Sequence, residues 1–296
     1  MKMLRNYSSI LLGILFFSLA GTTAAQKTDT YNLDETYEIS ENGTIELHSN
    51  DAGLVDIRGS DRNQVRLIVT YRLEVDGLSI GKQDKFDMEV AERNGDLIIR
   101  ETADEQGLNL NLGSVTKKYT ITILAPRDAN LDLYGDDDTY EITDMDGSIR
   151  IDSDDGEMYL RNCRGGEFHF DYDDGELVMD SGSGRLVLNV DDGEADVRNG
   201  RFDEVDITSA DGDINLSTSL AEGGNYNVGS DDGDIDLTIL DGGGEFRVEH
   251  DDIRISAGPD FEQVERNENF TRYRLPGGSA RVRIETDNGG VRFFTR

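Results

Sequence analysis

Cysteine, tryptophan and proline are scarce in this chain of 296 residues, which has one cysteine, no tryptophan and three prolines. With a single cysteine, Cys163, no disulfide can form within the chain. Cys163 stands before Arg164-Gly165-Gly166, a sequence typical of a turn, and the nearest histidine, His169, lies in an expected strand. A catalytic thiol would need a paired histidine. We therefore expect Cys163 to be a turn or packing residue with no chemical role.

Basic residues are also few, since 29 Lys and Arg stand against 62 Asp and Glu and give a formal net charge of -33. A chain this acidic repels phosphates, which excludes nucleic acid and anionic membrane surfaces as natural partners. Cationic partners and divalent metal ions remain compatible with the composition.

Long apolar runs are confined to the first 25 residues. Lys2 and Arg5 precede the apolar stretch Ile10–Ala20, and Thr23-Ala24-Ala25 resembles a cleavage site. That stretch is about half of the roughly 20 residues that a membrane-spanning helix needs. We predict that residues 1–25 are a secretory signal peptide, with no membrane-spanning segment after its removal. The protein would then be exported to the periplasm, the cell surface or the medium, and no cysteine directly follows the cleavage site to make it a lipoprotein.

Glycine is abundant, at 33 residues, and apolar residues alternate with polar ones along most of the chain. Such alternation in segment after segment is typical of β-strands and not of a disordered acidic chain. No helical stripe follows residue 25. We predict an all-β protein.

A short turn sequence recurs, with its glycines 19, 18, 19 and 21 residues apart. The five copies are Asp154-Asp155-Gly156, Asp173-Asp174-Gly175, Asp191-Asp192-Gly193, Ala210-Asp211-Gly212 and Asp231-Asp232-Gly233. A degenerate copy, Asp251-Asp252-Ile253, follows about one period later, and looser relatives stand at 51–53 and 287–289. Repeats of near-constant length are typical of folds in which each copy packs on the next.

Two short alternating segments flank each turn. Ahead of the first full copy stand Ile149 and Ile151, and past its glycine stand Met158 and Leu160. Arg150 lies between the first pair and would face water if its neighbours face inward. One repeat cannot bury such a face alone, so stacked copies should share a continuous core.

Two architectures fit this pattern. Asp-Gly between alternating strands is also a hairpin signal, which would give an antiparallel meander. A parallel β-solenoid, with one coil of about 18–21 residues per repeat, explains a further feature. Five residues past the glycine, successive repeats carry Arg161, Asp180 and Arg198, and in-register coils would place these opposite charges about 4.8 Å apart. We predict the parallel β-solenoid, capped by irregular β segments.

The regularity of the pattern divides the chain into parts. After the signal peptide, residues 26–129 read as an irregular β segment, 130–257 as the regular repeat coils, and 258–296 as a loop with capping strands. Atypical terminal segments are expected, because the last coil of a solenoid exposes unpaired backbone. Loops expected at 77–86, 102–118 and 258–269 are candidates for binding specificity.

Several motifs together resemble a known family. They are Tyr119-Thr120-Ile121-Thr122-Ile123 with Pro126 and Ala129–Leu133 after it, the Asp-Gly-Asp-Ile turns at 211–214 and 232–235, and Ile284-Glu285-Thr286. In this order they resemble the bacterial putative-adhesin family of β-strand-repeat proteins, a domain of unknown function, over most of residues 40–296. The resemblance implies an exported β-solenoid at the envelope or surface with no established enzymatic activity. This chain departs from the pattern in having Asp-Asp-Gly where a small or polar residue often precedes Asp-Gly.

The acidic turns are a candidate calcium site. In stacked coils their carboxylates would form adjacent columns, and Ca²⁺ takes roughly 6 to 8 oxygen ligands. The candidate ligands are Asp154, Asp155, Asp173, Asp174, Asp191, Asp192, Asp211, Asp231 and Asp232. The alternative is turn chemistry alone, in which Asp caps its own turn, Gly takes a positive φ and the carboxylates stay solvated.

Three function classes are compatible with these features. An exported, non-enzymatic, adhesin-like binding or structural protein, with a surface glycan or protein as partner, agrees best with the regular repeats. A scaffold stabilised by Ca²⁺ through its Asp columns is the alternative. A polysaccharide-active β-helix enzyme agrees less well, because no long insertion interrupts the repeats to build a cleft.

Overall fold

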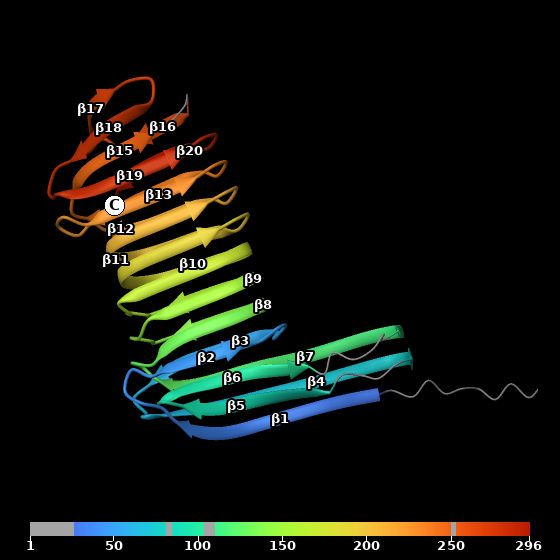
Figure 1. Cartoon of the computed structure of the whole chain (residues 1–296). Coiled ribbons are helices and arrows are strands. Elements are labelled where there is room, and N and C mark those ends of the chain that lie inside the picture. Colours follow the sequence, from blue (N-terminus) through green and yellow to red (C-terminus); the bar gives the residue numbers. More distant parts are fainter. Residues whose placement is uncertain (1–26, 81–84, 104–109, 250–252) are drawn as a thin grey trace, which may run out of the picture.

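The computed structural model describes residues 27–80, 85–103, 110–249 and 253–296, so the expected signal peptide lies outside the described residues. These residues form twenty strands, joined in one large, mostly parallel hydrogen-bonded network. The strands make an elongated stack (Figure 1). The all-β prediction is confirmed. The described residues contain no helix of the length and apolarity that crossing a membrane requires.

The centre of the stack is built from successive repeats that pair in parallel and in register. Its strands are β8 (Asn130–Thr143), β9 (Ile149–Arg161), β10 (Glu167–Val190), β11 (Glu194–Ser209), β12 (Ile214–Ser219), β13 (Asn225–Ser230) and β14 (Ile235–Asp241). Asp155 lies opposite Asp174, and Gly156 opposite Gly175. Neighbouring copies of the turn therefore stack directly, and the antiparallel meander is excluded.

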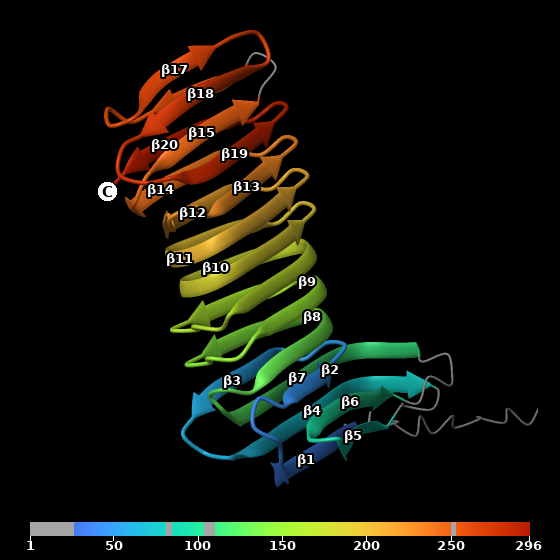
Figure 2. The ribbon, with the colours of Figure 1, turned by 60° about the vertical axis from the view of Figure 1, so that its left-hand side comes forward.

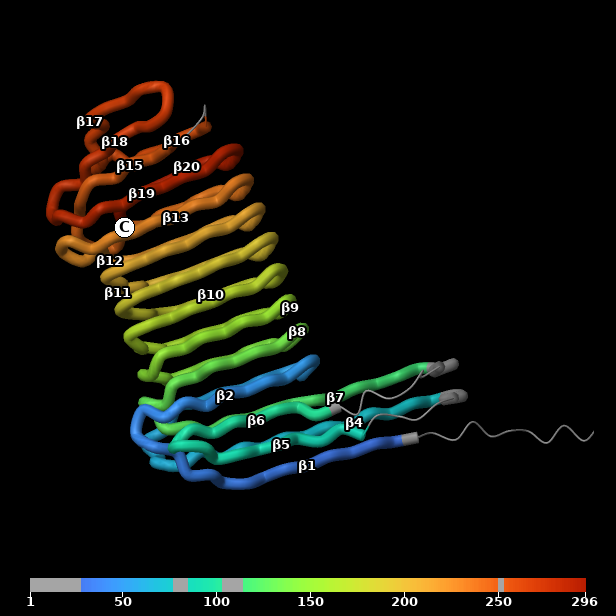
Figure 3. Tube along the Cα trace, viewed as in Figure 1, coloured from blue at the N-terminus to red at the C-terminus, as the bar shows by residue number. Residues whose placement is uncertain are grey.

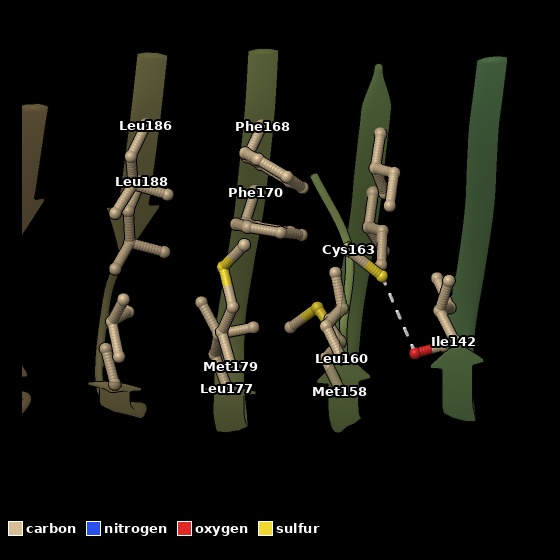
Figure 4. Packing of buried hydrophobic residues seen from close by; sticks show 14 of the residues in the cluster. Ile142, Met158, Leu160, Cys163, Phe168, Phe170, Leu177, Met179, Leu186 and Leu188 are labelled. Carbon is tan, nitrogen blue, oxygen red and sulfur yellow. Dashed lines mark hydrogen bonds between the residues drawn. The ribbon is translucent and has the colours of Figure 1, made fainter. Parts of the chain in front are cut away.

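Each repeat contributes to two ladders of strands, one before the turn and one after it. Ile149 and Ile151 pair with Phe168 and Phe170 in the first ladder. Met158 and Leu160 pair with Leu177 and Met179 in the second. All eight side chains are buried. Figure 4 shows the rows to which Phe168, Leu177 and Met158 belong, in neighbouring repeats. The apolar residues of both ladders form the continuous core that the alternation predicts.

At the C-terminal end of the stack, the strands do not lie in the order in which they follow one another in the sequence. The strands there are β15 (Gly244–Glu249), β16 (Arg254–Ala257), β17 (Glu262–Arg266), β18 (Phe270–Leu275), β19 (Ala280–Thr286) and β20 (Gly290–Thr295). β19 pairs in parallel with both β13 and β15, and β20 with both β14 and β16. The turn at 287–289 therefore stacks on 231–233, whereas residues 251 and 252 of the degenerate copy lie outside the described residues.

The same rearrangement occurs at the other end. The strands there are β1 (Lys27–Glu38), β2 (Thr44–His48), β3 (Leu54–Ser60), β4 (Gln64–Ile80), β5 (Phe86–Arg93), β6 (Asp96–Ala103) and β7 (Leu110–Pro126). β2 pairs in parallel with β6 and β8, and β3 with β7 and β8. The repeat formed by β2 and β3 thus lies between its later neighbours (Figure 2).

Antiparallel strands close both ends of the stack (Figure 3). β4 pairs with β7, β1 with β4, and β5 with β6. β18 pairs with β15, and β17 with β18. Parts of the expected loops are strands, since β4 and β7 pair from Arg66 opposite Leu124 to Ile80 opposite Leu110, and β17 lies within 258–269. Residues 81–84 and 104–109 of the expected loops lie outside the described residues. The boundaries at 129 and 257 remain predictions.

Aromatic clusters fill the core at both ends. Near β1 the ring of Phe86 stacks on Tyr71 with 4.1 Å between centroids and meets the Tyr119 ring edge-on at 4.8 Å. Near β18 the rings of Phe261 and Tyr273 meet the Phe293 ring edge-on at 4.8 and 5.0 Å. In the centre of the stack, each repeat packs its apolar side chains against the next repeat. At the two ends, these aromatic side chains take the place of that missing neighbour.

The stacking geometry makes one glycine position testable. Gly175 has a φ of 132°, and a Cβ there would lie 1.9 Å from the carbonyl oxygen of Gly156. We expect Gly175→Ala to destabilise the protein by about 2 kcal/mol or more, because the side chain forces neighbouring repeats apart and strains the backbone. Thermal melts of both the variant and the wild type would measure this.

Gly166→Ala is the matched control. No atom lies within 4 Å of a Cβ built at Gly166, so its melting temperature should stay close to that of the wild type. Equal melts for all three proteins would contradict the close stacking at the turn.

Candidate functional site

All nine aspartates predicted to form columns lie at one edge of the stack. We call this edge the acidic corner; it comprises the turns at 51–53, 136–138, 154–156, 173–175, 191–193, 210–212, 231–233 and 287–289. The nine side chains are exposed. Asp155 pairs in register with both Asp137 and Asp174. The columns exist as predicted, and they are open to solvent.

Electrostatic repulsion acts along the acidic corner. Partial desolvation and then the neighbouring carboxylates of Asp174 and Asp137 raise the pKa of Asp155. Desolvation and like-charged neighbours in adjacent repeats also raise the pKa values of Asp173 and Asp211. Within the described residues, no three His, Cys, Asp or Glu side chains gather as a set of metal ligands. Calcium binding stays a prediction.

The backbone of the acidic corner is held by the chain itself. The N–H groups of Gly212 and Gly233 donate to the hydroxyls of Ser209 and Ser230, each at 2.9 Å, and the N–H of Gly289 donates to Thr286 at 3.1 Å. These hydroxyl residues are buried. Sequence reasoning missed them, although a Ser or Thr three residues before the glycine is a visible signal.

Asp138 departs from the rest of the corner. It pairs in register with Gly156, so it occupies the glycine position of its turn, and its side chain is fully buried. The Ser49 hydroxyl and the Ala52 N–H donate to its carboxylate, and the Tyr140 hydroxyl donates at 3.2 Å. Burial raises the pKa of Asp138 to about 6 against the opposing effect of these hydrogen bonds.

The opposite edge of the stack is a second polar corner, which sequence reasoning missed. Asp144, Asn162, Ser181 and Asn199 stand there in successive repeats with φ between 54° and 67°. Asn and Asp tolerate this left-handed backbone better than most residues. A spacing of 18 or 19 residues between such side chains was the available signal. We call this edge, from 144–147 through 162–166 and 181–184 to 199–203, the arginine corner, after Arg164 and Arg201.

The predicted column of alternating charges is present, but its ion pairs differ. Asp180 lies opposite both Arg161 and Arg198 in register. The Arg198 guanidinium binds Asp196 on its own strand, with 3.0 Å from Nε to Oδ1, while Asp180 accepts from Asn199 at 2.8 Å. Arg198 thus forms its ion pair with a carboxylate two residues away on its own strand and not with Asp180 on the neighbouring strand.

Cys163 is a packing residue. Its thiol is buried, and Sγ lies 3.7 Å from the carbonyl oxygen of Ile142 (Figure 4). Burial raises the pKa of the Cys163 thiol to about 11, which keeps it protonated at neutral pH.

Asp138 should make stability depend on pH. Its folded-state pKa of about 6 exceeds the value of about 3.9 expected in the unfolded chain. The folded state therefore binds the proton more tightly, and this stabilisation is lost as the pH rises through 6. The loss begins above about pH 4 and approaches about 3 kcal/mol above pH 6, and roughly half of it falls between pH 5 and pH 7.5. We expect the melting temperature of the wild type to fall between pH 5 and pH 7.5 relative to that of Asp138→Asn. Parallel pH profiles would contradict this role of Asp138.

Repulsion at the acidic corner should make stability depend on salt. Raising NaCl from about 20 to about 300 mM screens exposed like charges, so the melting temperature should rise. The rise should be smaller in an Asp173→Asn/Asp191→Asn variant. A melting temperature that does not change with salt would contradict the repulsion.

A comparison of Ca²⁺ with Mg²⁺ at the same ionic strength tests whether the acidic corner coordinates calcium. A saturable rise in melting temperature with Ca²⁺ alone would establish a calcium site. Equal effects of the two ions would contradict the calcium hypothesis.

Comparisons with known proteins identify the family of this chain. A search of the curated proteins gives no match. Among solved structures, the chain is similar to a putative adhesin of Bacteroides fragilis (12% identity, 92% of this chain and 99% of that chain, TM-score 0.41). It is also similar to a putative adhesin of Parabacteroides distasonis (11%, 90% and 97%, TM-score 0.44) and to a putative lipid binding protein of the same species (14%, 88% and 96%, TM-score 0.36). The family Toastrack DUF4097 matches residues 22–293. The predicted resemblance is therefore confirmed, and the chain belongs to the Toastrack DUF4097 family.

Proposed function

We propose that this protein is a non-enzymatic, exported β-solenoid that acts as an adhesin-like binding or structural element of the cell envelope. The observation that carries the proposal is the in-register parallel stacking of the repeats. Such stacking gives a rigid body with long, exposed edges of repeated polar groups. Extended surfaces of this kind suit a polymer or a protein partner.

The placement of the perturbed carboxyl group supports a non-catalytic role. Asp138 has a raised pKa, as catalytic acids often do, but it is fully buried and hydrogen-bonded to Ser49, Ala52 and Tyr140. A substrate would have to open the core to reach it. Its contacts therefore support a structural function, in which Asp138 joins β8 to residues 49–52.

A calcium-stabilised scaffold is the second candidate. The raised pKa values of Asp155, Asp173 and Asp211 favour it, because a cation at the acidic corner would relieve the repulsion that contributes to them. This candidate is compatible with the first, since a metal-stabilised solenoid can also bind a partner.

The proposed location is the periplasm, the cell surface or the medium. It rests on the signal-peptide pattern of residues 1–25 and on the resemblance to exported β-strand-repeat proteins. The proposed partner is a surface glycan or a surface protein.

Retention on envelope material tests this function. We expect the folded protein without residues 1–25 to bind a cell-wall or envelope-glycan fraction saturably, and the heat-unfolded protein to lose that binding. Pull-down over a concentration series would measure it, with product analysis of the glycan alongside. Linear, unsaturable retention would contradict the binding role, and release of shortened glycan would contradict the non-enzymatic one.

A further inference from the structure

A recess of about 460 Å³ lies at the arginine corner, where the segment after β9 meets the middle parts of β10 and β11. Its polar lining residues are Asn162, Arg164, Ser181, Ser183, Asn199 and Arg201. The chain carries 62 Asp and Glu, yet the described residues that line this recess include no carboxylate. Its chemistry is therefore opposite to that of the acidic corner.

The two guanidinium groups have unused hydrogen-bonding capacity. Nη2 of Arg164 donates to Oδ1 of Asn162 at 2.9 Å. Within the part of the chain that the structure describes, Arg201 has no ion pair or side-chain hydrogen bond. Elsewhere, Arg66 and Arg292 are bound by carboxylates in forked pairs. Arg201 thus carries a charge that no described residue compensates by direct contact.

The stack fixes the spacing of the two arginines. Ser183 lies opposite Arg201 in register, and its hydroxyl donates to the carbonyl oxygen of Arg164 at 3.4 Å. Arg164 and Arg201 are therefore two repeats apart, which is about 10 Å along the stack. The small serine between them leaves the space that forms the recess.

Two carboxylates of the arginine corner are already engaged by asparagines of the recess. Asp144 accepts from the side-chain amide of Asn162, and Asp180 accepts from that of Asn199 at 2.8 Å. Asp203 lines the adjoining recess, which shares Asn199 and Arg201. The side chains that line the space between the arginines therefore offer an anion N–H and hydroxyl donors and no carboxylate.

We propose that this recess binds an acidic sugar unit of a glycan, with the carboxylate held between Arg164 and Arg201 and the sugar hydroxyls bonded to Ser183 and the asparagines. The proposal rests on the binding function above and names its ligand class. Guanidinium groups bind carboxylates through paired, charge-assisted hydrogen bonds.

The residues that line the recess also favour an acidic sugar over other kinds of anion. Among the described residues, no apolar side chain lines the recess to hold an acyl chain, and no aromatic ring lines it to stack on a nucleobase. The net charge of -33 disfavours densely charged polyanions. A glycan with widely spaced acidic groups meets these conditions, and its hydroxyls match the hydroxyl and amide groups of the lining.

Binding of trigalacturonate to the whole exported chain tests the proposal. The probe should bind saturably, as measured by calorimetry, and its fully methyl-esterified form should bind at least tenfold more weakly. Arg164→Gln/Arg201→Gln should weaken binding at least tenfold, and Arg164→Lys/Arg201→Lys should fall between this variant and the wild type, because lysine keeps the charge but not the fork. Both arginines are exposed, so the melting temperatures should match.

Arg93→Gln/Arg266→Gln is the matched control, since it removes two exposed arginines that lie outside the recess and form no ion pair with any described residue. It should bind trigalacturonate as the wild type does. Equal loss in this control would reduce the effect to net charge and overturn the site.

The remaining outcomes distinguish the site from the proposed function. Wild-type protein that binds hexaglutamate as tightly as trigalacturonate would overturn the glycan assignment in favour of an acidic peptide. Trigalacturonate bound equally by the Gln variant would overturn this recess while leaving the binding function intact. If no wild-type binding of the probe is seen, the inference fails, and retention on the envelope fraction decides the proposed function separately.

Discussion

Backbone hydrogen bonding between parallel neighbours is the constraint on which the rest of this structure depends. Each repeat satisfies its amide and carbonyl groups on the repeats beside it, about 4.8 Å away. A position in one repeat therefore meets the same position in the next, as Gly156 meets Gly175 and Asp155 meets Asp174. This explains both the close approach at the turns and the accumulation of like charge along one edge. Without the in-register pairing, neither feature would follow from the sequence.

The same constraint separates the chemistry of the two edges. At the acidic corner the turn residues supply exposed carboxylates, and buried hydroxyls such as Ser209 and Ser230 hold the backbone. At the arginine corner the turn is made by left-handed Asn and Ser residues, and Arg164 and Arg201 project beside them. Since the two edges lie at opposite ends of the same short strands, the molecule has one strongly anionic side and one side of mixed charge. A partner approaching the stack would be oriented by this difference before any contact forms.

Local patterns were sufficient to predict the centre of the fold. The alternation around residues 149–160 and the near-constant spacing of the glycines specify which side chains face inward and how repeats align. Pairing at the ends was not predictable in this way, because the choice of β20 and not β16 as neighbour of β14 depends on the relative stability of partners distant in sequence. Asp138 was missed because a carboxylate in the glycine position is ordinary turn chemistry until its burial is known. The arginine corner was missed because Asn162 and Asn199 were not compared as a repeat of their own.

The insertion of β19 and β20 between earlier strands has a consequence for how the protein assembles. A stack whose repeats pair only in chain order can grow one repeat at a time as the chain emerges. Here the repeat of β15 and β16 reaches its final neighbours only when β19 and β20 are present, and β8 must meet β2 and β3 across the intervening β4 to β7. Contacts of such long sequence separation slow folding, since loop entropy is lost before the contact forms. A chain shortened before residue 280 would leave β13 and β14 with unpaired outer edges, which are sites for association with other chains. Because both ends interleave strands that are distant in sequence, folding depends on the whole length of the chain. A shortened chain would instead expose strands with unpaired backbone groups.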